Sequence, residues 1–282
     1  MHLHISYEVP DWNQGCYRDK APVLSAARPW QMVHPDKSDI AVVLCTGYGG
    51  YPGEMVRPGD DLFDRGYDVF CPREPGCGTS GADFQQTGRA DWYQSAENCY
   101  RFVRSRYQIV YLVGHSMGGL TAIKLAHRFH VSRLVLLAPA LDVLAFEDPR
   151  FIGQLKGMEH PVRVQWHSDP SYRLHYENAP CDDAKLGEEY FSWLYPRQML
   201  EMYAYQQEAI SLLPSLPGNT RLVASGKDVL VGPDCRDLFL EKKRLGYNEY
   251  VEVKGATHFS MYDPDPKAED EVMAYVVSWL DA

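Results

Sequence analysis

Short apolar runs recur along the chain, and each ends at a glycine, a proline or a polar stretch. They are rich in Val, Ile and Leu and barely alternate between apolar and polar positions, as strands covered on both faces do. These runs predict the buried strands of a parallel sheet: Ile40–Cys45, Tyr67–Pro72, Ile109–Gly114, Leu134–Pro139, Thr220–Ser225 and Glu249–Gly255.

Segments with helical periodicity separate several of these runs. Between Asp91 and Arg106, the apolar residues Trp92, Ala96, Cys99 and Val103 recur at a spacing of three or four. Similar patterns predict helices over Met117–His130, Asp234–Leu245 and Pro266–Leu280. A chain that alternates strands and helices in this way predicts an α/β fold with a doubly wound, mostly parallel sheet.

The N-terminal part has a different pattern. The segments "HLHISYEV" and "RPWQMVHP" alternate more cleanly and predict an antiparallel pair at one edge of the sheet. With these two counted, Leu134–Pro139 is the sixth strand of the chain.

One long region interrupts the alternation. From Asp142 to Leu216 the chain is crowded with Trp, Tyr, Pro and His. An insertion of this length between two strands predicts a cap over the carboxyl ends of the strands, where open α/β sheets bind ligands. We therefore expect a core domain made of residues 1–141 and 217–282, and a cap made of residues 142–216.

The composition excludes some classes of function. Of the 282 residues, 45% are hydrophobic and 23% are charged, as in soluble globular proteins, and the net charge is −10. This charge argues against nucleic acid and anionic lipid surfaces as partners. The chain shows neither a signal peptide nor an apolar stretch near 18 residues, so we expect no stable membrane insertion. The sequence does not specify an oligomeric state.

The cysteines predict the compartment. There are seven, an odd number, and no two of them form a CxxC pair. Free thiols in a reducing cytoplasm account for this pattern better than a disulfide framework does. His2 and His4 form an HxH without an evident third ligand, so we expect neither a metal nor a cofactor.

The strongest chemical signal is Gly114-His115-Ser116-Met117-Gly118, a Gly-x-Ser-x-Gly motif. The five-residue pattern alone is a weak signal, but here it follows a predicted strand and precedes a predicted helix. That setting is the one a nucleophile elbow requires, because the sharp turn needs glycines around the serine. The alternative is a glycine-rich turn with no chemical role.

A nucleophilic serine requires a general base and an acid that orients it. His258 is the best placed histidine, because it follows the last predicted strand, and in this fold order the base comes late. His115 would point away from the substrate, and packing or surface roles account for His127 and His130. His160, His167 and His175 fall in the cap.

The acid is expected after the preceding strand. Asp228 lies where that strand ends, at a position from which a carboxylate can reach the imidazole. Asp234 is better explained as a helix N-cap. Asp142, one strand earlier, is the alternative acid.

The reaction also needs backbone donors for the developing oxyanion. The residue after the serine, Met117, supplies one N–H group. The glycine-rich segment "TGYGGYPGEM" follows the Ile40–Cys45 strand, and we expect Tyr48 to supply the other. A plain strand-to-helix connection is the alternative for this segment.

With these residues placed, the chain resembles the α/β-hydrolases, and within them the bacterial carboxylesterase, monoacylglycerol lipase and lysophospholipase group. The resemblance covers about residues 40–140 and 218–280 and rests on "GHSMGG" and on the segment "CPREPGCGTSGAD…DWYQSAENCYRFV". Relatives usually have His-Gly-Phe and Gly-His-Gly where this chain has Thr46-Gly47-Tyr48 and Gly76-Cys77-Gly78. The histidines typically support the oxyanion loop, so the resemblance leaves open what replaces them.

The resemblance implies a serine hydrolase that cleaves a small-molecule carboxylic ester with a hydrophobic acyl or aryl group. Two interpretations of the aromatic residues in the cap stay open: a wall for an apolar substrate, or packing between cap and core. An aminopeptidase or amidase of the same fold is a rival, with Glu147, Asp148, Glu188 or Glu189 as its amine anchor. A ligand-binding homologue without turnover is a further alternative.

Overall fold

The computed structural model describes all residues except 1–3, 11, 13–14, 176–178, 217 and 243–247. Its centre is a sheet of seven strands in the order β1-β3-β2-β4-β5-β8-β9. The β1 strand is antiparallel to β3, and every other neighbouring pair is parallel. The strands are β1 (Trp30–Met32), β2 (Ile40–Cys45), β3 (Asp68–Cys71), β4 (Ile109–His115), β5 (Leu134–Leu137), β8 (Thr220–Ser225) and β9 (Asn248–Val253).

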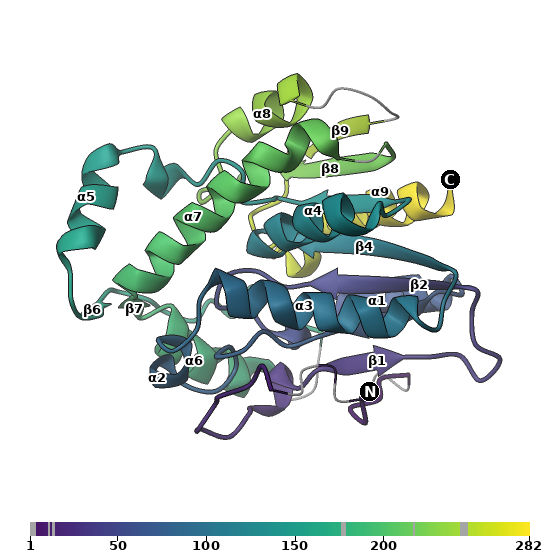
Figure 1. The fold of residues 1–282 in the computed structure, drawn as a ribbon, viewed down its shortest axis with the longest axis horizontal. Coiled ribbons are helices and arrows are strands. Elements are labelled where there is room, and N and C mark those ends of the chain that lie inside the picture. Colours follow the sequence, from purple (N-terminus) through teal and green to yellow (C-terminus); the bar gives the residue numbers. More distant parts are fainter. Residues whose placement is uncertain (1–3, 11, 13–14, 176–178, 217, 243–247) are drawn as a thin grey trace.

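Helices cover both faces of this sheet (Figure 1). The core splits accordingly: alternate residues of β2 pack on one side with α3 and α4, and on the other side with α1 and α9. The helices between and after the strands are α1 (Val56–Asp64), α2 (Gly81–Phe84), α3 (Arg89–Arg104), α4 (Met117–Phe129), α8 (Asp234–Lys242) and α9 (Pro266–Asp281). The predicted doubly wound α/β fold is confirmed.

The predicted elements of the core match closely, and the N-terminal edge differs. Ser6 forms one isolated antiparallel bridge to Gln31, and β1 pairs with β3 rather than with a regular first strand. The inserted region therefore follows the fifth strand, β5. The end of the predicted helix Asp234–Leu245 lies outside the described residues.

The region between β5 and β8 contains its own helices and a two-stranded ribbon. Its long helix α7 packs against α4 and α5 and crosses Figure 1 diagonally. The elements of this region are α5 (Pro149–Gly157), β6 (Val162–Arg163), α6 (Ala179–Tyr190), β7 (Trp193–Leu194) and α7 (Pro196–Leu212). Across the whole described chain there are also five short 3₁₀ turns, at Ser25–Ala27, Pro52–Met55, Leu144–Phe146, Leu213–Ser215 and Ser260–Tyr262.

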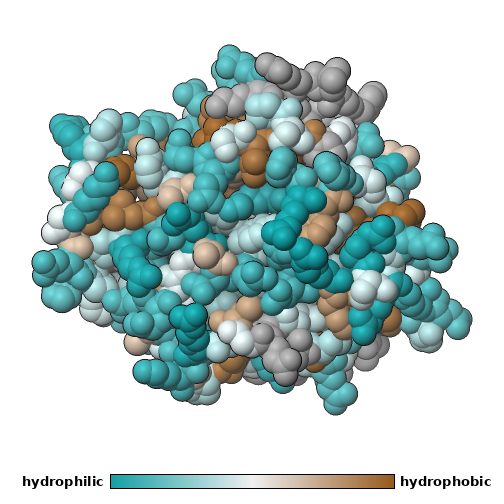
Figure 2. All heavy atoms as spheres, viewed as in Figure 1, coloured by the Kyte–Doolittle hydropathy of each residue, from teal (hydrophilic) through white to brown (hydrophobic). Residues whose placement is uncertain are grey.

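The face of the molecule shown in Figure 2 is mostly hydrophilic, with hydrophobic residues in small separate groups. This distribution agrees with a core enclosed between the sheet and its helices. Within the described residues, no helix has both the length and the apolar character needed to cross a bilayer.

Candidate active site

Ser116 lies on the tight turn between β4 and α4. Its backbone has φ 53° and ψ −120°, a region that residues with a side chain rarely adopt. The turn requires glycine at the neighbouring positions 114 and 118. A Cβ on Gly114 would lie 2.3 Å from the Gly118 carbonyl oxygen, and a Cβ on Gly118 would lie 2.2 Å from the Cys45 carbonyl oxygen. The Ser116 N–H donates to the Leu137 carbonyl at 2.9 Å, which fixes the turn to β5. The sequence around Ser116 thus forms the strand, turn and helix of an elbow.

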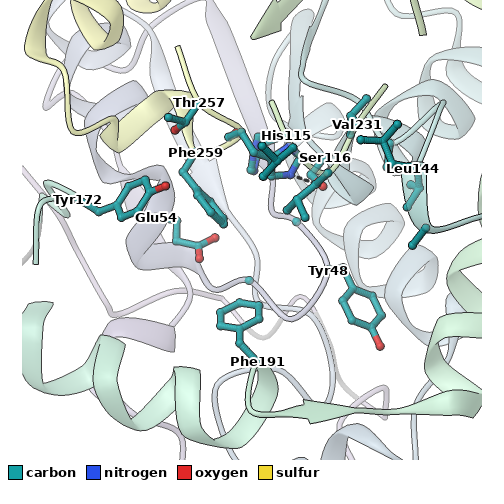
Figure 3. A pocket seen from close by; sticks show the side chains of 18 of the residues that line it. Tyr48, Glu54, His115, Ser116, Leu144, Tyr172, Phe191, Val231, Thr257 and Phe259 are labelled. Carbon is teal, nitrogen blue, oxygen red and sulfur yellow. Dashed lines mark hydrogen bonds between the residues drawn. The ribbon is translucent and has the colours of Figure 1, made fainter. Parts of the chain in front are cut away.

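Three side chains from three loops meet at this turn. His258 Nε2 lies 3.0 Å from Ser116 Oγ, and His258 Nδ1 lies 2.7 Å from Asp228 Oδ2 (Figure 3 draws Ser116 and its surroundings). The side chains of His258 and Asp228 are only 6% and 4% exposed. This is the geometry of a Ser-His-Asp relay, in which the carboxylate holds the imidazole with its free nitrogen toward the hydroxyl.

The environment of Asp228 keeps its carboxylate charged. Burial acts to raise its pKa, but the hydrogen bond and charge of His258 and the N–H groups of Val231 and Leu230 outweigh it, so the pKa falls below its usual value. Asp228 Oδ1 accepts from Leu230 N–H at 2.8 Å and from Val231 N–H at 2.9 Å. One carboxylate oxygen thus shapes its own loop while the other orients the imidazole.

The alternative acid, Asp142, has a different role. Its Oδ2 accepts the N–H of Asp234 at 3.0 Å, and its backbone carbonyl accepts the N–H of Gly232 at 2.7 Å. Asp234 itself is the first residue of α8. Asp142 therefore supports the start of α8 instead of contacting His258.

The start of the inserted region is joined to the loop that carries Asp228. Val143 forms an isolated antiparallel bridge with Val231, and Leu144 N–H donates to the Leu230 carbonyl at 3.0 Å. The first residues after β5 are thus held against the acid loop by backbone hydrogen bonds.

His115 differs from its predicted orientation, because its ring lies in the lining of the cavity above Ser116 (Figure 3). Its Nε2 lies 2.8 Å from the His258 carbonyl oxygen. Burial, and then the nearby His258, lower the pKa of His115 to about 3, so its ring is neutral and Nε2–H donates to that carbonyl. His115 is therefore poorly suited to act as a base, and it supports the loop of His258.

The remaining histidines have other partners. His127 contacts Ser215 Oγ at 2.8 Å, His175 pairs with Glu269, and His4 stacks on Phe63. His130 ends α4 in a left-handed conformation, and His167 lines the cavity. His2 lies outside the described residues. Within the described part of the chain, no group of three or more potential ligands lies close enough to hold a metal ion.

The two expected oxyanion donors flank Ser116. Met117 N–H is at the start of α4, and Tyr48 lies in the oxyanion loop, which we define as Thr46–Tyr51. Neither N–H group takes part in a hydrogen bond among the described residues. A Cβ on Gly47 would lie 3.4 Å from Ser116 Cβ, so the loop passes directly beside Ser116. Both donors are thereby available to a substrate oxygen.

The sequence departs from the resemblance at two turns, and at the second of them, Gly76–Gly78, other residues hold the backbone. The Tyr190 hydroxyl accepts from Thr79 N–H and donates to the Gly76 carbonyl, each at 2.8 Å. Asp19 accepts the N–H of Gly76 at 2.9 Å. The Cys77 thiol is fully buried, and burial raises its pKa, so it is a poor second nucleophile.

A cavity of about 680 Å³ opens above Ser116, a size typical of small-molecule sites. Figure 3 shows Leu144 and Val231 on the Ser116 side and Glu54, Tyr172 and Thr257 on the opposite side. We call the side of Leu144 and Val231 the apolar end, and the lining of the cavity as a whole also contains the apolar residues Val143, Ala145, Phe146, Met199, Met202, Val229 and Leu230. We call the side of Glu54, Tyr172 and Thr257 the polar end, where Phe259 also lies; the lining further contains the polar residues His167, Asp169, Asp183 and Tyr262.

Sequence reasoning missed three residues around this site: Glu54, Asp19 and Tyr190. The signal for Glu54 was available, because a single acid in the apolar stretch "YPGEMV" is unusual directly before a buried helix. Nothing local marks Asp19 or Tyr190, since each acts on the Gly76 turn from a distant part of the chain.

Comparison with known proteins gives the family. A sequence model of the family described as serine aminopeptidase, S33, matches residues 36–265. A thermostable monoacylglycerol lipase from Bacillus sp. (strain H-257) is 24% identical over 257 residues, which cover 88% of this chain and 92% of the relative.

Solved structures agree with this fold. One similar structure comes from a study of LipS and LipT, two metagenome-derived lipolytic enzymes. Its TM-score is 0.77 and its sequence identity 18%, and the match covers 92% of this chain and 99% of that chain. A soluble variant of monoglyceride lipase from Saccharomyces cerevisiae has a TM-score of 0.69 and 17% identity, covering 93% and 94%. Since the family match spans most of the chain, this protein belongs to the serine aminopeptidase S33 family of α/β-hydrolases.

Proposed function

We propose that the protein is a serine hydrolase that cleaves carboxylic esters through an acyl-enzyme on Ser116. The observation that carries this proposal is the position of Ser116 Oγ, 3.0 Å from His258 Nε2, on the wall of the 680 Å³ cavity. The hydrolytic relatives support the same class of reaction.

In this mechanism His258 Nε2 accepts the Ser116 proton as Oγ attacks the ester carbonyl carbon. Asp228 stabilises the imidazolium that forms. The N–H groups of Tyr48 and Met117 stabilise the oxyanion of the tetrahedral intermediate. His258 then gives the proton to the leaving alcohol oxygen. In the second half of the reaction, a water molecule attacks the acyl-enzyme while His258 accepts its proton, and His258 returns that proton to Ser116 Oγ as the acid product leaves.

The shape of the cavity supports an ester with an apolar acyl group. We propose that residues 142–216 act as the cap and supply apolar lining residues such as Leu144, Phe146 and Met202, while Val229 and Leu230 come from the loop of Asp228. The leaving alcohol is then directed to the polar end. A monoacylglycerol fits this division, and a lysophospholipid is the second candidate.

The aminopeptidase rival is less well supported. The four cap acids expected to bind an amine do not line the cavity: Asp148 pairs with Arg150, Glu188 with Arg163, and Glu189 accepts Gly81 N–H. Three other acids line it. Burial raises the pKa of Glu54 to about 8 and also raises the pKa of Asp183, whereas the hydroxyl and N–H of Ser171 lower the pKa of Asp169 and already occupy its Oδ1. An uncharged carboxyl is a weak anchor for an ammonium group.

The test is a panel of p-nitrophenyl esters of graded chain length, monoacylglycerols, lysophospholipids and aminoacyl p-nitroanilides, assayed with wild type and Ser116→Ala. We expect ester turnover that falls at least 10⁴-fold in Ser116→Ala, on the order seen when a catalytic serine is removed. Amide turnover without ester turnover would favour the aminopeptidase. A protein that neither turns over an ester nor labels with a fluorophosphonate would be a ligand-binding homologue.

A further inference from the structure

Glu54 is a buried carboxyl group that the proposed reaction does not use. It lies in the short turn Pro52–Met55, directly after the oxyanion loop, and is only 6% exposed. It nevertheless lines the cavity, and Figure 3 shows its carboxyl group between the side chains of Phe259, Tyr172 and Phe191. Placing an acid here costs stability, because burial disfavours its charged form.

The contacts of Glu54 are with the oxyanion loop. The Glu54 backbone N–H donates to the Tyr51 carbonyl at 3.0 Å. Glu54 Oε2 fills the space beside Gly50, where a Cβ would lie only 2.6 Å away. Gly50 N–H in turn donates to the Gly47 carbonyl at 3.0 Å and closes the turn that contains Tyr48. Glu54 therefore packs against the turn that presents the proposed donor.

A second contact reaches the loop of the proposed base. The turn Pro52–Met55, which carries Glu54, contacts the turn Ser260–Tyr262, and the Glu54 carboxyl group and the Tyr262 hydroxyl act on each other's pKa. Tyr262 lies four residues after His258, in the turn Ser260–Tyr262, and its N–H donates to the Phe259 carbonyl at 3.0 Å. The turn of Glu54 thus contacts the segments on both sides of Ser116.

We propose that Glu54 is a positioning residue that ties the oxyanion loop to the segment following His258. The proposal rests on the proposed ester hydrolysis, because it assigns Glu54 a part in placing the Tyr48 N–H group relative to Ser116 and His258. It takes no proton from the substrate and forms no bond with it.

The charge state of Glu54 supports this role. Burial raises its pKa to about 8, the nearby Tyr51 and Tyr262 oppose this increase, and Asp183 adds to it. The other titratable groups that act on it or are acted on by it are Glu74, Cys71 and Cys77, and burial raises the pKa of each. Glu54 is therefore uncharged at neutral pH. Its ionisation at higher pH would place a negative charge beside the developing oxyanion, where positive or dipolar groups are needed.

The experiment compares Glu54→Ala, Glu54→Gln and Tyr262→Phe with wild type. Glu271→Ala serves as a control, because Glu271 is an exposed acid on α9. The readouts are kcat and KM for one p-nitrophenyl ester from pH 5.5 to 9.5, with thermal unfolding at each pH.

We expect Glu54→Ala to lose kcat about 10- to 100-fold with KM changed less than threefold, since a small misplacement of a catalytic donor acts on the transition state. Glu54→Gln should recover most of this kcat at neutral pH. It should also remove a decline in kcat that wild type shows above pH 8. Tyr262→Phe should lower kcat by less than Glu54→Ala does.

The proposal is overturned if Glu54→Ala keeps wild-type kcat, if only KM changes, or if the decline above pH 8 persists in Glu54→Gln. Should Glu54→Ala fail to fold, the pH profile of Glu54→Gln decides the question alone. Failure of the proposed ester hydrolysis is distinguishable, because wild type itself would then show no turnover.

Discussion

The two glycine-rich turns that meet at Ser116 are held in different ways. The elbow from Gly114 to Gly119 is fixed by close backbone contact, with the Gly118 Cα against the Cys45 carbonyl and Gly119 against Pro139. The oxyanion loop is closed by one backbone hydrogen bond, from Gly50 to Gly47, and is otherwise packed against a side chain, that of the ionisable Glu54. A turn fixed by steric contact should tolerate changes of pH but few substitutions. A turn fixed by side chains should tolerate some substitution but respond to protonation.

The largest effect should come from adding a methyl group to the elbow. In Gly118→Ala the new Cβ would lie 2.2 Å from the Cys45 carbonyl oxygen, so the turn must move and Ser116 with it. We expect kcat/KM for a p-nitrophenyl ester to fall more than about 1000-fold. Gly153→Ala is the matched control, because nothing lies within 4 Å of that position in α5 and alanine favours a helix. Near-normal activity of Gly118→Ala would refute the steric account of the elbow.

The next effect is a pH dependence of stability that belongs to the oxyanion loop. Because Glu54 has a pKa of about 8 in the folded protein and 4.5 as its ordinary value, the folded state holds more protons than the unfolded state between these values. The free energy of unfolding therefore falls as pH rises, by roughly 3 kcal/mol between pH 5 and 8.

Glu54→Gln should remove this part of the slope, as measured by denaturant unfolding at several pH values. Below pH 4.5 Glu54 is protonated in both the folded and the unfolded state, so its contribution to the pH dependence of stability should level off there. Identical slopes in Glu54→Gln and wild type would show that Glu54 is charged in the folded protein.

A smaller effect is expected from a methyl group within the oxyanion loop. In Gly50→Ala the Cβ would lie 2.6 Å from Glu54 Oε2 and 3.1 Å from the Gly47 backbone. Since a side-chain carboxyl group moves more readily than a backbone, we expect kcat to fall only about 10- to 100-fold. The double variant Gly50→Ala/Glu54→Ala should lose less than the sum of the two single effects. Strict additivity would mean that the two residues act independently.

The smallest effect should come from the turn next to the oxyanion loop. Tyr190→Phe removes a hydroxyl that makes two hydrogen bonds, to Thr79 and Gly76. Loss of these buried bonds should lower the free energy of unfolding by about 1–3 kcal/mol, and it should change kcat less than threefold. Tyr203→Phe, on α7, is a control for the loss of a tyrosine hydroxyl. A kcat loss above tenfold in Tyr190→Phe would show that this turn acts on the chemistry directly.

The core of the fold could be predicted because its signals are local. The Ile40–Cys45 and Thr220–Ser225 strands match their apolar runs at both ends, and the Gly114–Gly118 motif has its strand and helix beside it in the sequence. The meeting of Ser116, His258 and Asp228 followed from strand order, because parallel strands bring their carboxyl ends to one edge of the sheet.

The rest could not be predicted because it depends on distant contacts. The orientation of His115 is set by the His258 carbonyl, 143 positions away. The helix α7 between β5 and β8 is placed by its packing against α4. The two strands of the ribbon in this region, β6 and β7, have only two residues each, too few to give a periodic signal. The support of the Gly76–Gly78 turn, where relatives have a histidine, comes from Tyr190 and Asp19, whose partners are known only once the chain is folded.

The bridge between Val143 and Val231 has a consequence for how a substrate reaches Ser116. Any outward swing of the inserted region about its first residues would pull on Leu230 and Val231, whose N–H groups hold Asp228. Opening at that end would therefore switch off the acid that orients His258. A substrate that enters without disturbing Asp228 and His258 must therefore reach Ser116 while the contact between Val143 and Val231 stays closed.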